Sequence, residues 1–240
     1  MSKRPDCLLL FDIDGTLLLT GGAGARAMLR AGRRLWGERL SWVGVEAAGG
    51  LDPALFEEAM ERSGIPVSED DHLRFRALYI GFLEEELGRG RADVIAMPGV
   101  RELLDELRTQ TDVELGLLTG NYGPAARLKI AAAGLSPEWF EVAAFGDDAP
   151  SRPKLVEVAI DRFEARHGVR VDHRRIVVIG DTPRDVHCAL ENGCMAFAVA
   201  TGKHAPSVLR EAGAHVVVES LIDPSPLRRV IEGFRNSREH

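Results

Sequence analysis

The sequence contains few cysteines and none of the motifs that cysteines or histidines usually build. Its 240 residues include only Cys7, Cys188 and Cys194, with no Cys-x-x-Cys pair. An odd number of widely spaced cysteines offers neither a disulfide framework nor a zinc ribbon. The seven histidines form no His-Glu-x-x-His motif. We therefore expect a reducing compartment, the cytoplasm.

Long apolar runs and an excess of positive charge are also missing. No stretch approaches the roughly 18–20 apolar residues of a membrane span, and the apolar run at residues 7–11 is too short for a secretory signal core. The net charge of −7 is opposite in sign to that of most nucleic-acid-binding proteins. We expect no membrane and no nucleic-acid partner. Phosphorylated metabolites are compatible with this negative net charge, because local dipoles, a metal ion and one or two cations can bind an anion.

Short apolar runs alternate with amphipathic segments along most of the chain. The runs are rich in Val, Ile, Leu and Phe, which is typical of strands buried on both faces of a parallel sheet. Helical patterns lie between them, and two begin near Pro98 and Pro124. The alternation predicts an α/β fold, a Rossmann-like parallel sheet sandwiched by helices. The predicted strands are residues 7–11, 115–118, 142–145, 176–179, 196–199 and 215–218.

Residues 17–94 have a different character, with helical patterns but no convincing buried strand. We predict that they form an α-helical cap inserted into an α/β core made of residues 1–16 and 95–240. The glycine-rich stretch Gly21–Gly24 is expected to be a hinge. Asp52 is expected to be the N-cap residue of a helix within this insertion, with Pro53 as the first helical residue. Active sites of open α/β sheets lie beyond the carboxyl ends of the strands, so this cap would cover the site as a lid.

Three carboxylates directly follow predicted strands. Asp12 and Asp14 come after the first strand, and extended geometry would turn both side chains to one side of the chain. Neighbouring acids raise each other's pKa, and a bound Mg²⁺ removes that cost because it prefers oxygen ligands. Asp181 follows the strand at 176–179 and would reach the same edge. Capping a helix needs one acid rather than two, so a metal site is favoured.

Other polar residues occur at the same kind of position. The strand at 115–118 is followed by Thr119, Gly120 and Asn121. These residues would hold a phosphate oxygen or cap the next helix. Arg152 and Lys154 stand at the entrance of a helix, and one of them would neutralise a phosphoryl group.

Thr182 and Asp185 have the spacing of a capping box around Pro183. Thr182 would be the N-cap residue, Pro183 the first residue of the helix and Asp185 its third. This interpretation leaves Asp181 unexplained.

The motifs, taken in chain order, resemble those of the haloacid dehalogenase (HAD) superfamily. The resemblance covers most of the chain, and residues 17–94 resemble the C1-type helical cap of phosphoglycolate phosphatase-like members. It implies a magnesium-dependent phosphatase that acts on small phosphomonoesters. The motifs are Asp12-Ile13-Asp14-Gly15-Thr16, Thr119, the segment around Arg152, and Asp181 with Asp185.

The resemblance also implies roles for individual residues. Asp12 would attack phosphorus and form an aspartyl-phosphate, and Asp14 would protonate the leaving group and later activate water. Asp12, the backbone carbonyl of Asp14 and Asp181 would bind Mg²⁺. Arg152 is favoured as the cation, although it departs from the lysine of many relatives and Lys154 lies nearby as the alternative. For the phosphate, the candidates are Thr119 with Gly120 or Asn121, and either Arg152 or Lys154. The supporting residues are Thr16, Thr182 and Asp185.

Alternative functions stay open at this point. The second acid, Asp14, favours phosphoryl transfer over dehalogenation, because halide departure needs no proton. A phosphomutase would use the same residues and return the phosphoryl group to another hydroxyl, and a non-catalytic regulator would only bind a phosphorylated ligand. We expect a small phosphorylated metabolite as partner, with phosphoglycolate, sugar phosphates and nucleoside monophosphates as candidates. The protein is expected to be a monomer or a homodimer.

Overall fold

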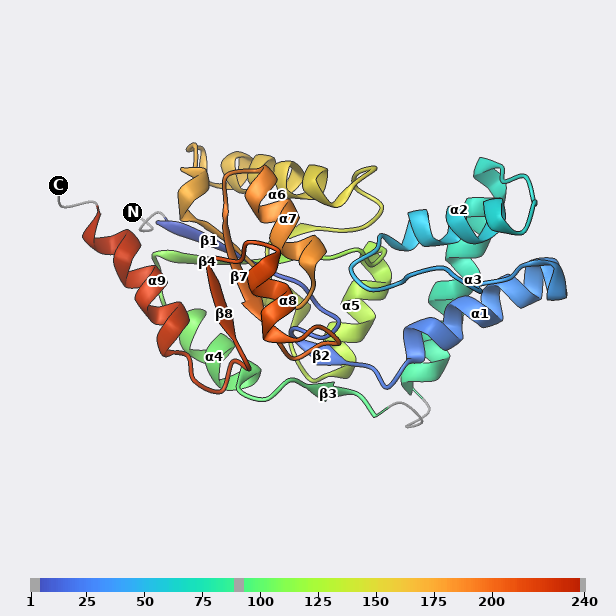
Figure 1. The fold of residues 1–240 in the computed structure, drawn as a ribbon, viewed down its shortest axis with the longest axis horizontal. Coiled ribbons are helices and arrows are strands. Elements are labelled where there is room, and N and C mark those ends of the chain that lie inside the picture. The colour runs from blue at the N-terminus through green and yellow to red at the C-terminus, as the bar shows by residue number, and fades with distance from the viewer. Residues whose placement is uncertain (1–4, 89–92, 238–240) are drawn as a thin grey trace.

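The computed structural model describes residues 5–88 and 93–237, which form an α/β body and a smaller helical body (Figure 1). Six parallel strands build the central sheet in the order β5-β4-β1-β6-β7-β8. Each of the six apolar runs predicted as a strand is one, and the predicted Rossmann-like fold is confirmed. The strands are β1 Cys7–Phe11, β4 Val113–Leu118, β5 Val142–Ala144, β6 Ile176–Gly180, β7 Met195–Val199 and β8 Val216–Val218.

Helices cover both faces of this sheet. On one face pack α4 (Val100–Leu107), α5 (Gly123–Ala132) and α9 (Ser225–Asn236). On the other face pack α6 (Arg152–His167), α7 (Pro183–Glu191) and α8 (Pro206–Glu211). Both faces are buried, which explains why the strand sequences are continuously apolar and do not alternate.

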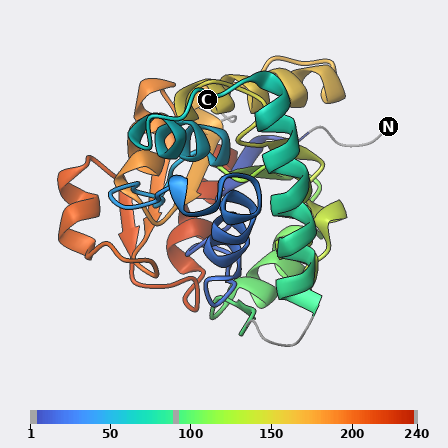
Figure 2. The same cartoon turned by 90° about the vertical axis from the view of Figure 1, so that its right-hand side faces the viewer.

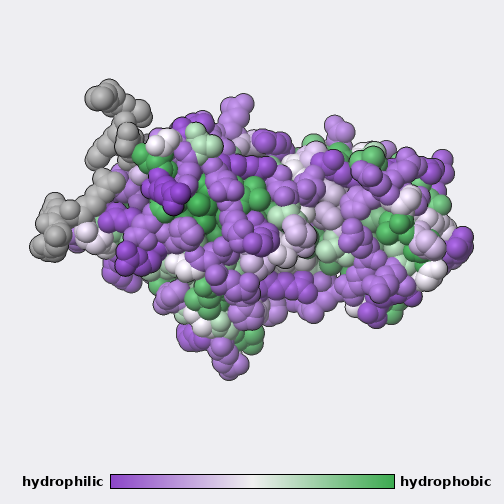
Figure 3. All heavy atoms as spheres, turned by 90° about the horizontal axis from the view of Figure 1, so that it is seen from above, coloured by the Kyte–Doolittle hydropathy of each residue, from purple (hydrophilic) through white to green (hydrophobic). Residues whose placement is uncertain are grey.

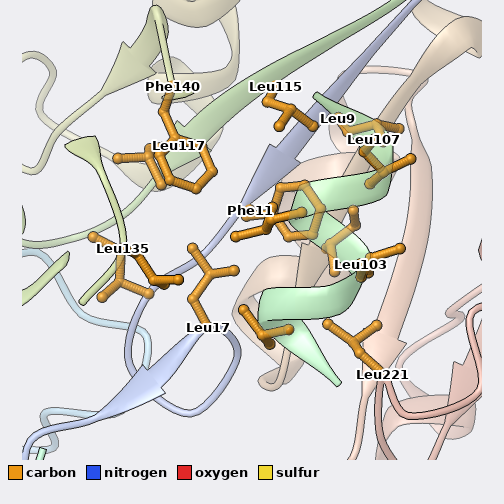
Figure 4. Close-up of a cluster of buried hydrophobic side chains, with 14 of the residues drawn as sticks. Leu9, Phe11, Leu17, Leu103, Leu107, Leu115, Leu117, Leu135, Phe140 and Leu221 are labelled. Atoms are coloured by element: carbon orange, nitrogen blue, oxygen red, sulfur yellow. The ribbon is translucent and has the colours of Figure 1, made fainter. Parts of the chain in front are cut away.

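The core on the α4 face shows how the strand and helix periodicities meet. Leu9 and Phe11 of β1 point to this face, because alternate strand residues share a side. Leu103 and Leu107 of α4 lie one helical turn apart and pack against them (Figure 4). The sheet is thereby fixed at its central strand, whose carboxyl end carries Asp12.

The helical body consists of α1 (Ala23–Trp36), α2 (Asp52–Arg62) and α3 (Glu69–Gly88), and we call it the cap. It lies at the end of the molecule opposite to the two termini (Figure 1), and α1 and α3 run side by side (Figures 1 and 2). The short strands β2 (Leu18–Leu19) and β3 (Ile95–Ala96) pair antiparallel where the chain leaves and re-enters the α/β body.

The interior of the cap is aromatic and continues into the α/β body. Phe56 and Phe75 stack with ring centroids 4.2 Å apart. Tyr79 of α3 and Tyr122, which precedes α5, belong to the same buried cluster. The Tyr122 hydroxyl and Nε2 of His72 are hydrogen-bonded at 2.7 Å. This continuity fixes the cap on the α/β body.

Short 3₁₀ turns complete the secondary structure, and the outer surface is largely polar. On the face seen in Figure 3 apolar residues form separate small patches. In the part of the chain that the structure describes, no helix is both long and apolar enough to span a bilayer. The 3₁₀ turns are η1 Gly37–Arg39, η2 Pro137–Trp139 and η3 His173–Arg175.

Candidate active site

The carboxyl ends of β1, β4 and β6 bring the predicted site residues together. Phe11 is in register with Leu117 and with Ile179, so the residues that follow these positions meet at one edge of the sheet. Asp12, Asp181 and Asp185 are buried, and each offers a carboxylate oxygen within 4.8 Å of the other two. Three acids, two from loops and one from the first turn of α7, thus share one small space.

Asp185 already uses both of its carboxylate oxygens. Its Oδ2 accepts hydrogen bonds from the backbone N–H and the hydroxyl of Thr182, at 2.9 and 2.6 Å. Its Oδ1 forms an ion pair with the guanidinium of Arg152. The capping box predicted for Thr182 and Asp185 is confirmed. Asp185 is therefore engaged in holding α7 and Arg152 in place.

The carboxylate of Asp181 lies against two glycines, and a side chain at either position would collide with it. A Cβ atom at position 202 would come within 1.7 Å of its Oδ2, and one at position 15 within 2.6 Å. Gly15 also has a φ of +88°, which favours glycine. The Thr16 hydroxyl donates to Oδ1 at 3.2 Å. Burial, reinforced by the charges of Asp12 and Asp185, raises the pKa of Asp181 to about 8.

Asp12 is held by a buried arginine. Burial raises the pKa of its carboxyl to about 6, and the positive charge of Arg152 opposes that rise. Nη2 of Arg152 lies 3.0 Å from Oδ1 of Asp12. The same guanidinium donates to the carbonyls of Leu118 and Gly49, each at 3.3 Å.

This donor set fits a divalent cation such as Mg²⁺. The donors are oxygens, they are buried, and burial and mutual repulsion raise the pKa of both Asp12 and Asp181 in the absence of a metal. The positive charge of a cation would offset this cost. Asp12 and Asp181 would hold the ion, because Asp185 has no free carboxylate oxygen.

Asp14 faces a second cation that the sequence analysis missed. Lys129 of α5 is buried, and its Nζ lies 2.9 and 2.6 Å from the two carboxylate oxygens of Asp14. Asn121 bonds to both residues: its Oδ1 accepts from Nζ at 2.6 Å and its Nδ2 donates to Asp14 at 2.8 Å. The available signal was a single lysine within the apolar helical stretch that ends at Ala133.

The loop after β4 joins this group and also contacts the cap. The Thr119 hydroxyl accepts from Nδ2 of Asn121 at 2.8 Å. Neither residue caps α5, whose N-cap position is Tyr122 without a side-chain cap. Gly120 lies against the cap, because a Cβ there would be 1.8 Å from the carbonyl oxygen of Gly50.

The expectation that Asp52 caps its own helix is wrong. Asp52 is the first residue of α2 and follows Leu51, and no side-chain cap is formed. Its Oδ2 accepts a hydrogen bond from the backbone N–H of Tyr122 at 3.0 Å, and its own N–H donates to the Gly120 carbonyl at 2.7 Å. Asp52 thus joins the cap to the α/β body.

Lys154 does not join the site. Its side chain is 57% exposed and pairs with Glu157, three residues along α6, at 2.7 Å. Arg152, two residues earlier, is turned inward because its guanidinium reaches Asp12 and Asp185. The buried cation supplied by this segment is Arg152.

A cavity of about 610 Å³ lies between these residues and the cap. It falls in the range of roughly 300–1,000 Å³ that is usual for small-molecule sites. On the side of the α/β body it is lined by Asp12, Asp14, Thr119, Lys129 and Asp181. A small ligand in this cavity can therefore contact the Asp12–Arg152 pair and the Asp14–Lys129 pair at once.

Comparisons with known proteins agree with this architecture. The family model of haloacid dehalogenase-like hydrolases matches residues 9–190. A phosphoglycolate phosphatase from Vibrio parahaemolyticus is 25% identical over 225 residues, which cover 92% of this chain and 95% of that protein. Two solved structures have the same fold. A hydrolase from Pseudomonas syringae has a TM-score of 0.68 at 21% identity and covers 90% of this chain and 95% of its own. A β-phosphoglucomutase from Clostridium difficile has a TM-score of 0.68 at 15% identity, with 99% and 100% covered.

Proposed function

Because this chain belongs to the haloacid dehalogenase-like hydrolase family, we propose that it is a magnesium-dependent phosphatase of small phosphomonoesters. One observation carries the proposal. The buried carboxylate of Asp12, fixed by Arg152, faces the same cavity as Asp14, fixed by Lys129. A nucleophile and a general acid therefore stand on the wall of one small-molecule cavity.

Two displacements at phosphorus would complete the reaction. An oxygen of Asp12 attacks phosphorus, the ester bond breaks, and Asp14 gives its proton to the departing alcohol oxygen. Water then attacks the aspartyl-phosphate while Asp14 takes a proton from it. Inorganic phosphate leaves and both carboxyl groups return to their starting state.

The other residues would hold these groups and the phosphate. Arg152 keeps the Asp12 carboxylate in one orientation, and Lys129 with Asn121 does the same for Asp14. Lys129 and the Thr119 hydroxyl would contact the phosphoryl oxygens. Mg²⁺ bound by Asp12, Asp181 and the carbonyl of Asp14 would supply positive charge that offsets the negative charge of the phosphoryl group.

The expected setting of this activity is the cytoplasm, with a phosphorylated metabolite as substrate. The relative from Vibrio parahaemolyticus is a phosphoglycolate phosphatase, which supports a phosphomonoester. The three cysteines are free and buried, as fits a reducing compartment.

A phosphomutase is the second candidate, favoured by the structural likeness to a β-phosphoglucomutase. The two activities differ in their products. A phosphatase releases one inorganic phosphate for each ester consumed, whereas a mutase forms an isomer of its substrate. A regulator that only binds a ligand is disfavoured by the complete set of Asp12, Asp14 and Asp181.

The test is release of phosphate from p-nitrophenyl phosphate. We expect release by the wild-type protein with Mg²⁺, and loss of at least about a hundredfold when the metal is removed with EDTA or in Asp12→Asn. Release that persists in Asp12→Asn would contradict an aspartyl-phosphate on this residue. Isomer formation without phosphate release from a sugar phosphate would favour the mutase.

A further inference from the structure

The wall that the cap contributes to the cavity is largely apolar, with Thr20, Asp52 and Tyr79 as its polar side chains. The side of the cavity formed by the α/β body is lined by the charged residues already described, whereas the side formed by the cap is lined mostly by aliphatic and aromatic side chains. These come from β2, from α1, from the segment after η1 and from α2. They are Leu19, Met28, Leu29, Trp42, Val45 and Leu55.

Two of these side chains are exposed although they are large and apolar. Leu29 is 50% exposed and Leu19 is 40% exposed, and both border the cavity. An apolar ligand group placed against them would remove this surface from water, which is favourable. Exposed apolar side chains gathered around a concave site are typical of ligand binding.

The cap offers the cavity no free cation among its described residues. The three cations that line the cavity, Lys129, Arg152 and Lys203, all belong to the α/β body. Lys203 is paired with Glu46 at 2.8 Å, and Lys129 and Arg152 are paired with the catalytic acids.

The arginines on α1 do not change this picture. Arg26 and Arg30 both pair with Glu86 of α3, at 2.9 and 2.8 Å, and neither lines the cavity. The acid on the cap side is Asp52, which offers an anion no positive charge. A second anionic group on the substrate, such as the carboxylate of phosphoglycolate, would face apolar side chains without a partner, which is costly.

We propose that the preferred substrates are phosphate monoesters of uncharged alcohols with an apolar body, and not esters that carry a second anionic group. This inference rests on the proposed phosphatase function. The phosphoryl group lies at the charged end of the cavity, and the alcohol part lies against Leu29, Trp42 and their neighbours.

The first test compares 2-phenylethyl phosphate with phosphoglycolate, both esters of primary alcohols, in the presence of Mg²⁺. We expect kcat/KM to be at least tenfold higher for 2-phenylethyl phosphate. Leu29→Lys places a cation on the apolar wall, and it should lower this ratio at least fivefold. Val43→Lys is the matched control, because Val43 is an 82% exposed apolar residue of the same body that does not line the cavity. It should leave both substrates within twofold of wild type.

A binding measurement separates this inference from the proposed chemistry. By calorimetry with Mg²⁺, 3-phenylpropylphosphonate should bind at least tenfold more tightly than 3-phosphonopropanoate. Equal or tighter binding of 3-phosphonopropanoate, or no binding of either, would overturn the inference. If 3-phenylpropylphosphonate binds as expected but no phosphoester is hydrolysed, the apolar subsite stands and the phosphatase function fails.

Discussion

Arg152 and Lys129 are both buried, but they are held in different ways. The guanidinium of Arg152 bonds to two carboxylates and to the carbonyls of Leu118 and Gly49, so its plane is fixed on all of these partners. Within the described part of the chain, the Lys129 ammonium bonds to the side chains of Asp14 and Asn121, which face the cavity. An ammonium group on a flexible stem can turn toward a ligand, whereas a fixed guanidinium cannot. Arg152 is therefore suited to fix the proposed nucleophile Asp12, and Lys129 is suited to contact the phosphoryl group of the proposed substrate.

Replacing Lys129 by methionine should reduce turnover strongly. The change removes the cation beside Asp14, and losing one preorganised charge stabiliser costs about 10²–10³ in kcat. The fold should survive, because the side chain of Asp14 is 42% exposed and water can solvate it. Phosphate release and thermal unfolding of Lys129→Met would be measured side by side.

Lys154→Met is the matched control for this substitution. Lys154 has the same charge and lies two residues from Arg152, but its side chain points to solvent and pairs with Glu157. Its loss should change kcat and KM less than twofold. A larger loss of turnover in Lys154→Met than in Lys129→Met would reverse the assignment of the cations.

The sequence predicted the acids of the site much better than its cations. Asp12 and Asp181 directly follow buried strands, and parallel strands end at one edge, so their meeting follows from local pattern alone. Lys129 lies ten residues beyond Thr119 on a helix. Its role depends on which way α5 is turned against the strand, and periodicity alone does not give that orientation.

Among the secondary structure elements, those with strictly local causes were predictable. The capping box of α7 needs only Thr182 and Asp185 at the right spacing, and it is formed. Asp52 has an equally suitable position at the start of α2, yet its carboxylate binds the Tyr122 N–H. Asp52 therefore bonds to a residue that is distant in the sequence and not to its own helix. Only the tertiary structure reveals such a partner. The pairing of β2 with β3 was missed for the same reason.

Gly81→Ala should stabilise the protein. Gly81 lies inside α3, and a Cβ at this position would meet no atom within 4 Å. Alanine restricts the unfolded chain and favours the helix, so the free energy of unfolding should rise by about 0.5–1 kcal/mol. Urea denaturation followed by circular dichroism measures this change.

Gly32→Ala is the comparison within the same body of the protein. Gly32 also lies inside a helix, α1, but a Cβ there would be 2.6 Å from Cδ2 of Leu40 and 3.2 Å from Nε1 of Trp42. Crowding should outweigh the helix preference and lower the free energy of unfolding. Equal stabilisation by both substitutions would show that the packing around Gly32 is looser than the structure indicates.

In the molecule as a whole, residues 46–52 connect the cap to several segments of the α/β body. Arg184 donates to the Ala48 carbonyl at 3.0 Å, Lys203 pairs with Glu46, and the Asp52 N–H donates to the Gly120 carbonyl. These contacts join segments far apart in the chain, so the sequence gives no sign of them. A lid over the site was predicted from the place of the insertion, and the hinge at Gly21–Gly24 stays a prediction.

Asp52 makes this junction sensitive to pH. Burial raises the pKa of its carboxyl from 3.8 to about 7, although Lys129 and the Tyr122 N–H oppose the rise. Below about pH 4 the group is protonated in both the folded and the unfolded chain and has no effect. Between about pH 4 and 7 the unfolded chain loses the proton while the folded chain keeps it, so this group makes stability fall as the pH rises.

Asp52→Asn should therefore stabilise the protein more at pH 8 than at pH 5. The amide can still accept the Tyr122 N–H bond but carries no charge, and a carboxyl whose pKa rises from 3.8 to about 7 costs up to about 4 kcal/mol above pH 7. Thermal or urea unfolding of both proteins at several pH values gives the difference.

Asp70→Asn, which removes an exposed acid from the first turn of α3, controls for the lost charge at a helix start and should give the same difference at pH 5 and pH 8. A difference between Asp52→Asn and wild type that is constant from pH 5 to 8 would mean that Asp52 keeps an ordinary pKa and that the junction of cap and α/β body is open to water.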